Sequence, residues 1–314
     1  MTTALSLRFP ADFHFEHTIY SHGWCALFPF LVDRASGTLT RAVGDGASGS
    51  GVLRFSLPSQ RRPRCELLTR GKPSAARLSA FASAARGILH LDLDLRPFHE
   101  RMRTEPATEW IARARAGRML RGETFFEDVV KMILTTNCSW SLTETMNARL
   151  VDTFGAEVAV GAKVAVGAEA SSGSHLFPTA AAIADSSEDF LRREVRLGYR
   201  APYVLELAHR VATGALDIES YRTADLSANE LHRALRDIKG VGEYAASNLL
   251  KLLGRFDSLG LDSWCRAKFA ELHNGGTVVP DSEIEAYYTR FEEWKGLVMW
   301  LDVTRHWYAE KFPF

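Results

Sequence analysis

The sequence predicts an α+β protein in which an N-terminal antiparallel sheet precedes a larger, mostly α-helical region. From Leu5 to Leu95, short apolar runs alternate with turn-forming clusters, of which Gly44 to Gly51 is the richest in glycine. This pattern is typical of antiparallel strands. After Pro97 the apolar residues recur at the helical period of about 3.6. We therefore expect a sheet domain at residues 1–97 and a helical domain at residues 98–314.

The bulk composition excludes several classes of protein. The 314 residues, 46% of them hydrophobic, are enough to bury a substantial core. Basic and acidic residues balance at 38 each, so a nucleic-acid surface would have to come from a local patch. No apolar stretch reaches the length that spans a membrane, and residues 1–13 lack the pattern of a signal peptide. We expect a cytoplasmic protein that does not contact a membrane.

The cysteines are scattered and have no histidines at zinc-binding spacing: Cys25, Cys65, Cys138 and Cys265. Neither a zinc site nor a disulfide framework fits that spacing, and no cluster of four cysteines is present to hold iron and sulfur. We therefore expect no zinc, no Fe–S cluster and reduced thiols.

The clearest predicted strand is Leu89 to Leu95, in which leucines alternate with polar residues. Because successive side chains of a strand point to opposite faces, the leucines would share one face. Asp92 and Asp94 would share the other, where they could form a pair of catalytic carboxylates. A polar face on a half-buried strand is usually only solvated, and we favour that interpretation.

A helical hairpin with a polar tip is predicted from Phe125 to Gly155. Its first helix carries apolar residues at helical spacing and ends at Thr135-Thr136-Asn137. Ser141 and Glu144 match a capping box and predict the start of the second helix, and Gly155 predicts its end. The segment 158–174, which repeats Val-Ala-Val-Gly-Ala, is interpreted as a loop insertion.

The most informative segment runs from Ser227 to Trp264. Ser227 and Glu230 form a second capping box before a helix that stops at Gly240. Gly240-Val241-Gly242 then makes a tight turn into a second helix, Glu243 to Leu253. Glycines here leave backbone N–H groups open at a helix start, where a phosphate is favoured. Such a contact binds DNA without reading its sequence, so Gly240, Val241 and Gly242 are predicted to bind DNA.

Two other interpretations of this turn are open to test. A glycine-containing turn can simply connect two helices. Gly240-Val241-Gly242-Glu243-Tyr244-Ala245 also matches the dinucleotide-binding fingerprint. That fingerprint needs a buried strand before it, whereas Leu231 to Ile238 has helical spacing, so a dinucleotide site is disfavoured.

Asp262 lies 20 positions after Gly242, in Leu261-Asp262-Ser263-Trp264. Alone it would be interpreted as the N-cap of the following helix. The order of helix, Gly-Val-Gly turn, helix, loop and aspartate resembles the signature of the helix-hairpin-helix DNA glycosylases, which ends in a catalytic aspartate. The resemblance implies that Asp262 is catalytic, and the capping role is compatible with it.

Other segments resemble this family in the same order, over about residues 100–305. The hairpin Phe125 to Gly155 is similar to the one whose tip enters the DNA, which implies that Asn137 fills the gap left by an extruded nucleotide. Leu197 to Val204 resembles a stretch of the 8-oxoguanine and 3-methyladenine branches. It implies that Tyr199 wedges the duplex and that Arg200 faces the unpaired base, although core packing remains the alternative for Tyr199.

The resemblance extends more faintly to the N-terminal sheet, which corresponds to a small TBP-like antiparallel domain in these branches. There, Phe15 to Asp33, with His22-Gly23-Trp24, is similar to the first strands. The base pocket implied by the resemblance consists of Tyr244, Trp24, Met299 and Val303. Trp300 and Trp307 are expected in the core.

Tyr244 distinguishes between branches of the family. It stands where branches that also cut the backbone carry a lysine, and Lys239 and Lys251 do not occupy that position. The 3-methyladenine branch has an aromatic residue there, and an aromatic face attracts an electron-poor alkylated base. Leu142 stands where the 8-oxoguanine branch has an arginine.

The sequence thus predicts a monomeric, monofunctional DNA glycosylase that acts on a flipped, alkylated base in double-stranded DNA. Asp262 would stabilise the positive charge that develops on the sugar. The family also implies a monovalent cation at the hairpin. The alternatives are an 8-oxoguanine-type glycosylase with lyase activity and a non-catalytic helix-hairpin-helix protein that only binds DNA.

Overall fold

The computed structural model describes every residue except 45, 47–48, 59–61, 159–174, 310–311 and 314. Within that part of the chain, five antiparallel strands form one sheet in the order β1-β5-β4-β3-β2. The strands are β1 (Thr2–Leu5), β2 (Phe30–Asp33), β3 (Thr38–Gly44), β4 (Ser50–Ser56) and β5 (Arg64–Leu68). Their alternation buries one row of side chains, which includes Leu39, Leu53 and Phe55, against helix α2 (Ala75–Ile88).

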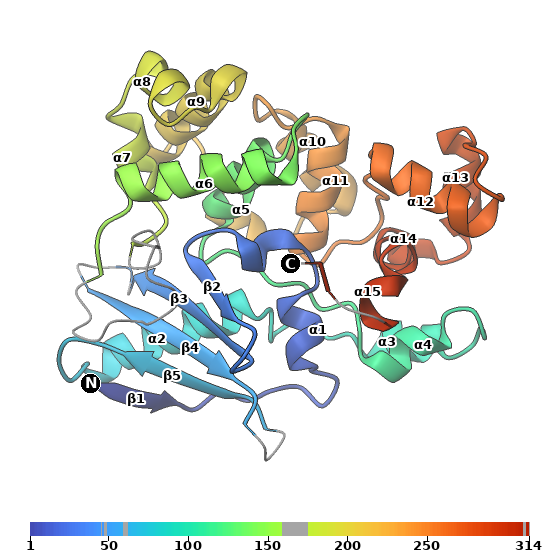
Figure 1. Cartoon of the computed structure of the whole chain (residues 1–314), viewed down its shortest axis with the longest axis horizontal. Coiled ribbons are helices and arrows are strands. Elements are labelled where there is room, and N and C mark those ends of the chain that lie inside the picture. Colours follow the sequence, from blue (N-terminus) through green and yellow to red (C-terminus); the bar gives the residue numbers. More distant parts are fainter. Residues whose placement is uncertain (45, 47–48, 59–61, 159–174, 310–311, 314) are drawn as a thin grey trace.

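The rest of the described chain is mostly helical. The remaining helices are α1 (Phe15–Ile19), α3 (Arg96–Met102), α4 (Glu109–Ala114), α5 (Phe125–Leu134), α6 (Trp140–Phe154), α7 (Ala180–Ala184), α8 (Glu188–Arg193), α9 (Ala201–Ala212), α10 (Ala228–Arg236), α11 (Glu243–Leu252), α12 (Ser263–His273), α13 (Asp281–Thr289), α14 (Lys295–Val303) and α15 (Arg305–Ala309). Figure 1 shows the sheet on one side of the molecule and α12 to α15 on the other, with α5 and α11 between them. No helix of the described ranges is both long and apolar enough to cross a membrane.

The predicted strand from Leu89 to Leu95 is wrong. Helix α2 runs to Ile88, and His90 turns the chain with a φ of 51°. The carbonyl groups of His90 and Leu93 accept hydrogen bonds from the guanidinium of Arg118, not from a neighbouring strand. The alternation sorted only part of the side chains: Leu89 is buried and Asp92 and Asp94 are exposed, but His90 of the expected polar row is buried.

Helix caps agree with the sequence in two places and differ in one. The capping box of Ser227 and Glu230 is present, and Gly155 caps the end of α6. Helix α6 begins two residues earlier than predicted, since the hydroxyl of Ser139 and not that of Ser141 accepts the cap hydrogen bond, from the Leu142 N–H. Of the predicted insertion 158–174, all but Val158 lies outside the described residues.

Helix α5 is tied to the sheet by buried charges. Arg41 on β3 donates two hydrogen bonds to Glu127, at 2.9 and 2.5 Å, and Lys131 Nζ lies 2.7 Å from the same carboxylate. All three side chains are fully buried. Breaking one partner of such a network leaves an uncompensated buried charge, so this contact fixes α5 against the sheet.

Candidate active site

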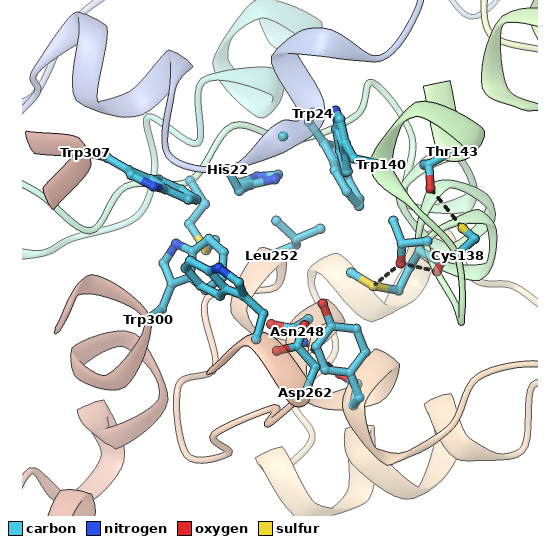
Figure 2. Close-up of a pocket in the computed structure, with 16 residues that line it drawn as sticks. His22, Trp24, Cys138, Trp140, Thr143, Asn248, Leu252, Asp262, Trp300 and Trp307 are labelled. Carbon is cyan, nitrogen blue, oxygen red and sulfur yellow. Dashed lines mark hydrogen bonds between the residues drawn. The ribbon is translucent and has the colours of Figure 1, made fainter. Parts of the chain in front are cut away.

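A cavity of about 510 Å³ opens between the N-terminal turn, α5, α6, α11 and the C-terminal helices (Figure 2). Its volume lies within the range of small-ligand sites. The wall contains five tryptophans, Trp24, Trp140, Trp264, Trp300 and Trp307. Figure 2 shows His22, Trp24 and Trp140 on one side of the cavity and Asn248 and Asp262 on the other.

Asp262 is the one acidic residue among the described residues that line this cavity. Its Oδ1 atom accepts a hydrogen bond from the Cys265 N–H at 2.7 Å, so the carboxylate caps α12 as its position in the sequence predicted. The dipole at a helix start favours a negative group there. The cap therefore fixes the orientation of the carboxylate beside the cavity.

Lys251 holds the loop that leads to Asp262. Its Nζ atom donates to Leu259 O at 2.7 Å and to Asn248 Oδ1 at 3.2 Å. The loop passes close over α11 at Gly260, which has a φ of +69° and where a Cβ atom would lie 2.8 Å from Asn248 Nδ2. Burial lowers the pKa of Lys251 to about 7. Lys251 is buried and is not among the described residues that line the cavity.

Tyr244 and Asn248 form the floor of the cavity on the first turns of α11. Asn248 Nδ2 donates to Tyr244 O at 2.9 Å, which fixes the amide. Burial raises the pKa of Tyr244, and the negative charge of Asp262 raises it further. The predicted pocket residue Tyr244 thus lies next to the predicted carboxylate.

His22-Gly23-Trp24 lies in a short turn and not in a strand, so the predicted first strands are wrong here. Trp24 lines the cavity as predicted, and its Nε1 donates to Asp128 at 2.8 Å. The turn passes so close to Trp140 that a Cβ atom on Gly23 would lie 2.2 Å from its ring. Only glycine fits that approach, which brings the turn of the N-terminal segment against α6.

The prediction that Met299 and Val303 form pocket walls is wrong. Both are fully buried in a second hydrophobic cluster with α3, α4, α12 and α13. On a helix these two residues share a face, whereas Trp300 is turned by about 100° from Met299. Trp300 and Trp307, which we expected in the core, both line the cavity, although Trp307 is also buried and Trp300 packs against the core.

The tip between α5 and α6 is exposed. Asn137 has a φ of 48° and lies on the surface, and the Tyr199 side chain is 43% exposed. Tyr199 Oη donates to Thr136 O at 3.0 Å. Arg200 is only 4% exposed and donates to the same carbonyl, so the prediction that it faces an unpaired base is wrong. It supports the tip from inside.

The glycine turn before α11 is also at the surface. Gly240 has a φ of +87°, and a Cβ atom there would lie 2.7 Å from the Tyr203 ring. The Val241 side chain is buried and its N–H donates to Ile238 O at 3.0 Å, so Val241 offers no free donor. Gly242 and Glu243 are exposed at the start of α11, where the first N–H groups have no partner within the helix.

The turn and the tip are in contact through two tyrosines. Tyr203 packs against Gly240 and meets Tyr199 edge-on, with ring centroids 6.2 Å apart. Tyr199 in turn bonds Thr136 at the tip. These two surface features therefore form one connected face. Elsewhere in the described ranges, no three His, Cys, Asp or Glu side chains gather in a way that could hold a metal ion.

The sequence matches no family model and no curated protein, but solved structures match nearly all of it. A 3-methyladenine DNA glycosylase from Archaeoglobus fulgidus is 18% identical, with 99% of each chain covered and a TM-score of 0.71. MBOgg1, solved with a low-affinity DNA ligand, is 18% identical, with 99% of this chain and 100% of its own covered and a TM-score of 0.73. An 8-oxoguanine glycosylase/lyase from Clostridium acetobutylicum, solved with double-stranded DNA, is 16% identical, with 94% of this chain and 92% of its own covered and a TM-score of 0.70.

The chain has the helix-hairpin-helix glycosylase fold. The predicted α+β class is thereby confirmed, together with the helical hairpin and the turn between α10 and α11. The same glycosylase fold accommodates 3-methyladenine and 8-oxoguanine enzymes, so it does not by itself choose a base.

Sequence reasoning missed several residues that line the cavity of this glycosylase fold, above all His22, Trp140 and Asn248. Asn248 could have been found, because it lies one helical turn after Tyr244 on the same face of α11. His22 and Trp140 come from segments far apart in the sequence. Only the close approach at Gly23 brings them together.

Proposed function

We propose that the protein is a monofunctional DNA glycosylase that removes an alkylated, electron-poor base from double-stranded DNA. The observation that carries this proposal is the position of Asp262. It is the acid of the described cavity wall, and its orientation is fixed by the start of α12. A cavity lined by aromatic rings with one carboxylate at its edge suits an extruded base and its sugar.

The chemistry follows from the charge that develops as the base departs. Breaking the N-glycosidic bond makes the sugar cationic, and an ionised carboxylate beside C1′ stabilises that state and orients water. Asp262 supplies this group. Because its Oδ1 atom is already held by the Cys265 N–H, little reorganisation is needed when the charge appears.

The cavity wall favours hydrolysis over lyase chemistry. A lyase step needs an amine that reaches the sugar. No lysine is among the described residues that line the cavity, and the Nζ atom of the buried Lys251 donates its hydrogen bonds within the protein, to Leu259 O and Asn248 Oδ1. The lyase named among the structural neighbours is an 8-oxoguanine glycosylase/lyase, so it differs in substrate and in reaction from the enzyme proposed here.

The aromatic wall supports an alkylated substrate. The faces of tryptophan and tyrosine attract a cation, and an alkylated base carries positive charge. No arginine or lysine of the described chain lines the cavity to repel such a base. The Archaeoglobus neighbour is named for 3-methyladenine, which agrees with this proposal.

DNA binding is assigned to the exposed turn and tip. The N–H groups at the start of α11, beside Gly242, would hold a phosphate, and Asn137 and Tyr199 would fill the gap in the duplex. The predicted monovalent cation at this turn stays a prediction, and no step depends on it.

A panel of duplexes tests the proposal. Each duplex carries one of 3-methyladenine, 1-methyladenine, 7-methylguanine, hypoxanthine, uracil or 8-oxoguanine. Excision is measured as the alkali-labile abasic site that remains in the strand after the base is released. We expect excision of alkylated bases and no protein–DNA adduct after borohydride treatment. If the protein binds DNA but excises no base from any duplex, the proposed activity is contradicted and the non-catalytic DNA-binding alternative is supported. A trapped adduct would support the lyase alternative.

A further inference from the structure

The imidazole of His22 is a polar group of the cavity wall to which the proposed reaction gives no role. Its Nε2 atom lies 2.7 Å from the carbonyl oxygen of Leu120. A carbonyl group only accepts hydrogen bonds, so Nε2 must carry the proton. In a neutral ring the other nitrogen, Nδ1, then holds a free lone pair and acts as an acceptor.

The ring stays neutral at physiological pH. Burial lowers the pKa of His22 to about 4, and the positive charge of Lys131 acts in the same direction. Nδ1 makes no hydrogen bond to the described residues, and it is not among their enclosed, unsatisfied nitrogens. Since the side chain lines the cavity, its lone pair is accessible from there.

The direction of this lone pair is fixed. The Leu120 carbonyl holds one edge of the ring, and Trp24 packs against it edge-on at 4.8 Å. The next residue, Gly23, touches Trp140. The His22 ring therefore cannot rotate without breaking its hydrogen bond to Leu120 and displacing Trp24.

The donors near His22 are already engaged with the protein. The indole N–H of Trp24 donates to Asp128, that of Trp140 to Glu144 at 3.0 Å, and that of Trp300 to Ser21 O at 2.9 Å. These indoles present only their rings to a bound base. On this side of the cavity the polar contact that remains is an acceptor.

We propose that His22 selects the base, because its Nδ1 lone pair accepts a hydrogen bond from an exocyclic amino group on the ring that enters the cavity. The substrate class is thus an amino-bearing purine such as 3-methyladenine. A base without that amino group leaves the buried acceptor unpaired, which disfavours it by about tenfold or more. This inference rests on the proposed function only in taking the ligand to be an extruded base.

Free bases test the inference without DNA, and the five tryptophans of the wall supply the signal. Titration of the full-length protein with 3-methyladenine and with 3-methylpurine, which lacks only the amino group, should quench tryptophan fluorescence. We expect the first to bind about tenfold more tightly. Equal affinities in the wild-type protein would overturn the role of His22. If neither base quenches the fluorescence, the cavity does not bind a base, and the proposed function is contradicted as well.

Two variants separate recognition from structure. His22→Leu removes the acceptor and should bring the affinity ratio of the two bases close to one. His22→Gln keeps an N–H donor for Leu120 and a carbonyl acceptor, so it should restore part of the ratio. If both variants discriminate as the wild type does, the inference is wrong.

A measurement on the unaltered protein covers the case in which the variants do not fold. In protein labelled with nitrogen-15 in histidine, 3-methyladenine should shift the resonance of one unprotonated Nδ1, and 3-methylpurine should not. An unchanged histidine spectrum would overturn the inference. If the protein discriminates between the free bases but excises no base from any duplex, the proposed glycosylase activity is refuted and the proposed contact of His22 with the base is supported.

Discussion

The two walls of the cavity differ in what they present to a ligand. The N-terminal wall, His22, Gly23, Trp24 and Met119, carries neutral polar groups whose N–H donors are hydrogen-bonded within the protein, which leaves the Nδ1 lone pair of His22 towards the cavity. The C-terminal wall, Asp262, Trp264, Trp300 and Trp307, carries the acid of the described cavity. The proposed selection of a base and the proposed stabilisation of charge therefore depend on residues more than two hundred positions apart. The difference teaches that mutation can separate the two tasks.

The largest effect should come from the acid of the C-terminal wall. Asp262→Asn removes the charge but keeps the helix cap, because asparagine caps as well as aspartate. We expect single-turnover excision to slow on the order of a hundredfold or more, about 2.7 kcal/mol. The affinity ratio of the two free bases should not change. An unchanged excision rate would assign the chemistry elsewhere.

The N-terminal wall should be the more sensitive to acid. His22 has a lowered pKa, about 4 against 6.5, so between these values the unfolded chain binds more protons than the folded one. The contribution of His22 to the free energy of unfolding, on the order of 2–3 kcal/mol, is present above about pH 6.5 and is lost as the pH falls towards 4. Urea unfolding of the wild type and of His22→Gln from pH 7 to 4 measures this. Other buried histidines contribute equally to both proteins, so parallel curves would contradict the assignment.

Lys251 tests whether the C-terminal wall depends on the loop beneath it. Lys251→Met removes the contacts to Leu259 and Asn248, and we expect about a tenfold slower excision, which corresponds to one or two lost hydrogen bonds. Because the pKa of Lys251 is about 7, the wild-type rate should fall as the ammonium loses a proton above that pH. The variant should show no such step.

Lys239→Met is the matched control, since Lys239 is exposed and pairs only with Glu206 among the described residues. It should keep the wild-type rate and the pH step. If both lysine variants behave alike, the effect is one of general charge and not of the loop.

The smallest effect concerns the link between the walls. Trp300 Nε1 donates to Ser21 O, which joins the C-terminal wall to the N-terminal segment. Trp300→Phe keeps an aromatic ring and removes this hydrogen bond. The free energy of unfolding should therefore fall by about 1 kcal/mol. Trp294→Phe, in the second hydrophobic cluster, is the matched control, and its free energy of unfolding should not include the decrease caused by loss of the hydrogen bond to Ser21. Equal stability of the Trp300 variant and the wild type would show the walls to be independent.

The parts of the site that lie close together in the sequence were predictable. Helix, turn, helix and Asp262 follow one another within 40 residues, and the resemblance of this order to the helix-hairpin-helix glycosylases is what implied a carboxylate in the site. The cap at Asp262 and the exposed tip at Asn137 were predictable for the same reason. Each depends on local backbone geometry.

The parts that depend on packing between distant segments were not predictable. Whether Met299 or Trp300 faces the cavity is set by the rotation of α14 about its axis, and a run of apolar residues does not reveal it. The sequence suggested that Arg200 contacts DNA, but its side chain is buried and donates a hydrogen bond to the Thr136 carbonyl. Leu89 to Leu95 looked like a strand because a side chain, Arg118, satisfies its carbonyl groups in place of a neighbour.

Gly240, Tyr203, Tyr199 and Thr136 form an unbroken row of contacts from the glycine turn to the tip. Because these residues are in contact from end to end, neither the turn nor the tip can shift along a DNA strand without the other. The distance between the phosphate that the turn is proposed to hold and the nucleotide that the tip is proposed to displace would thereby be constant. Damage near a strand terminus, where that phosphate is missing, should escape excision.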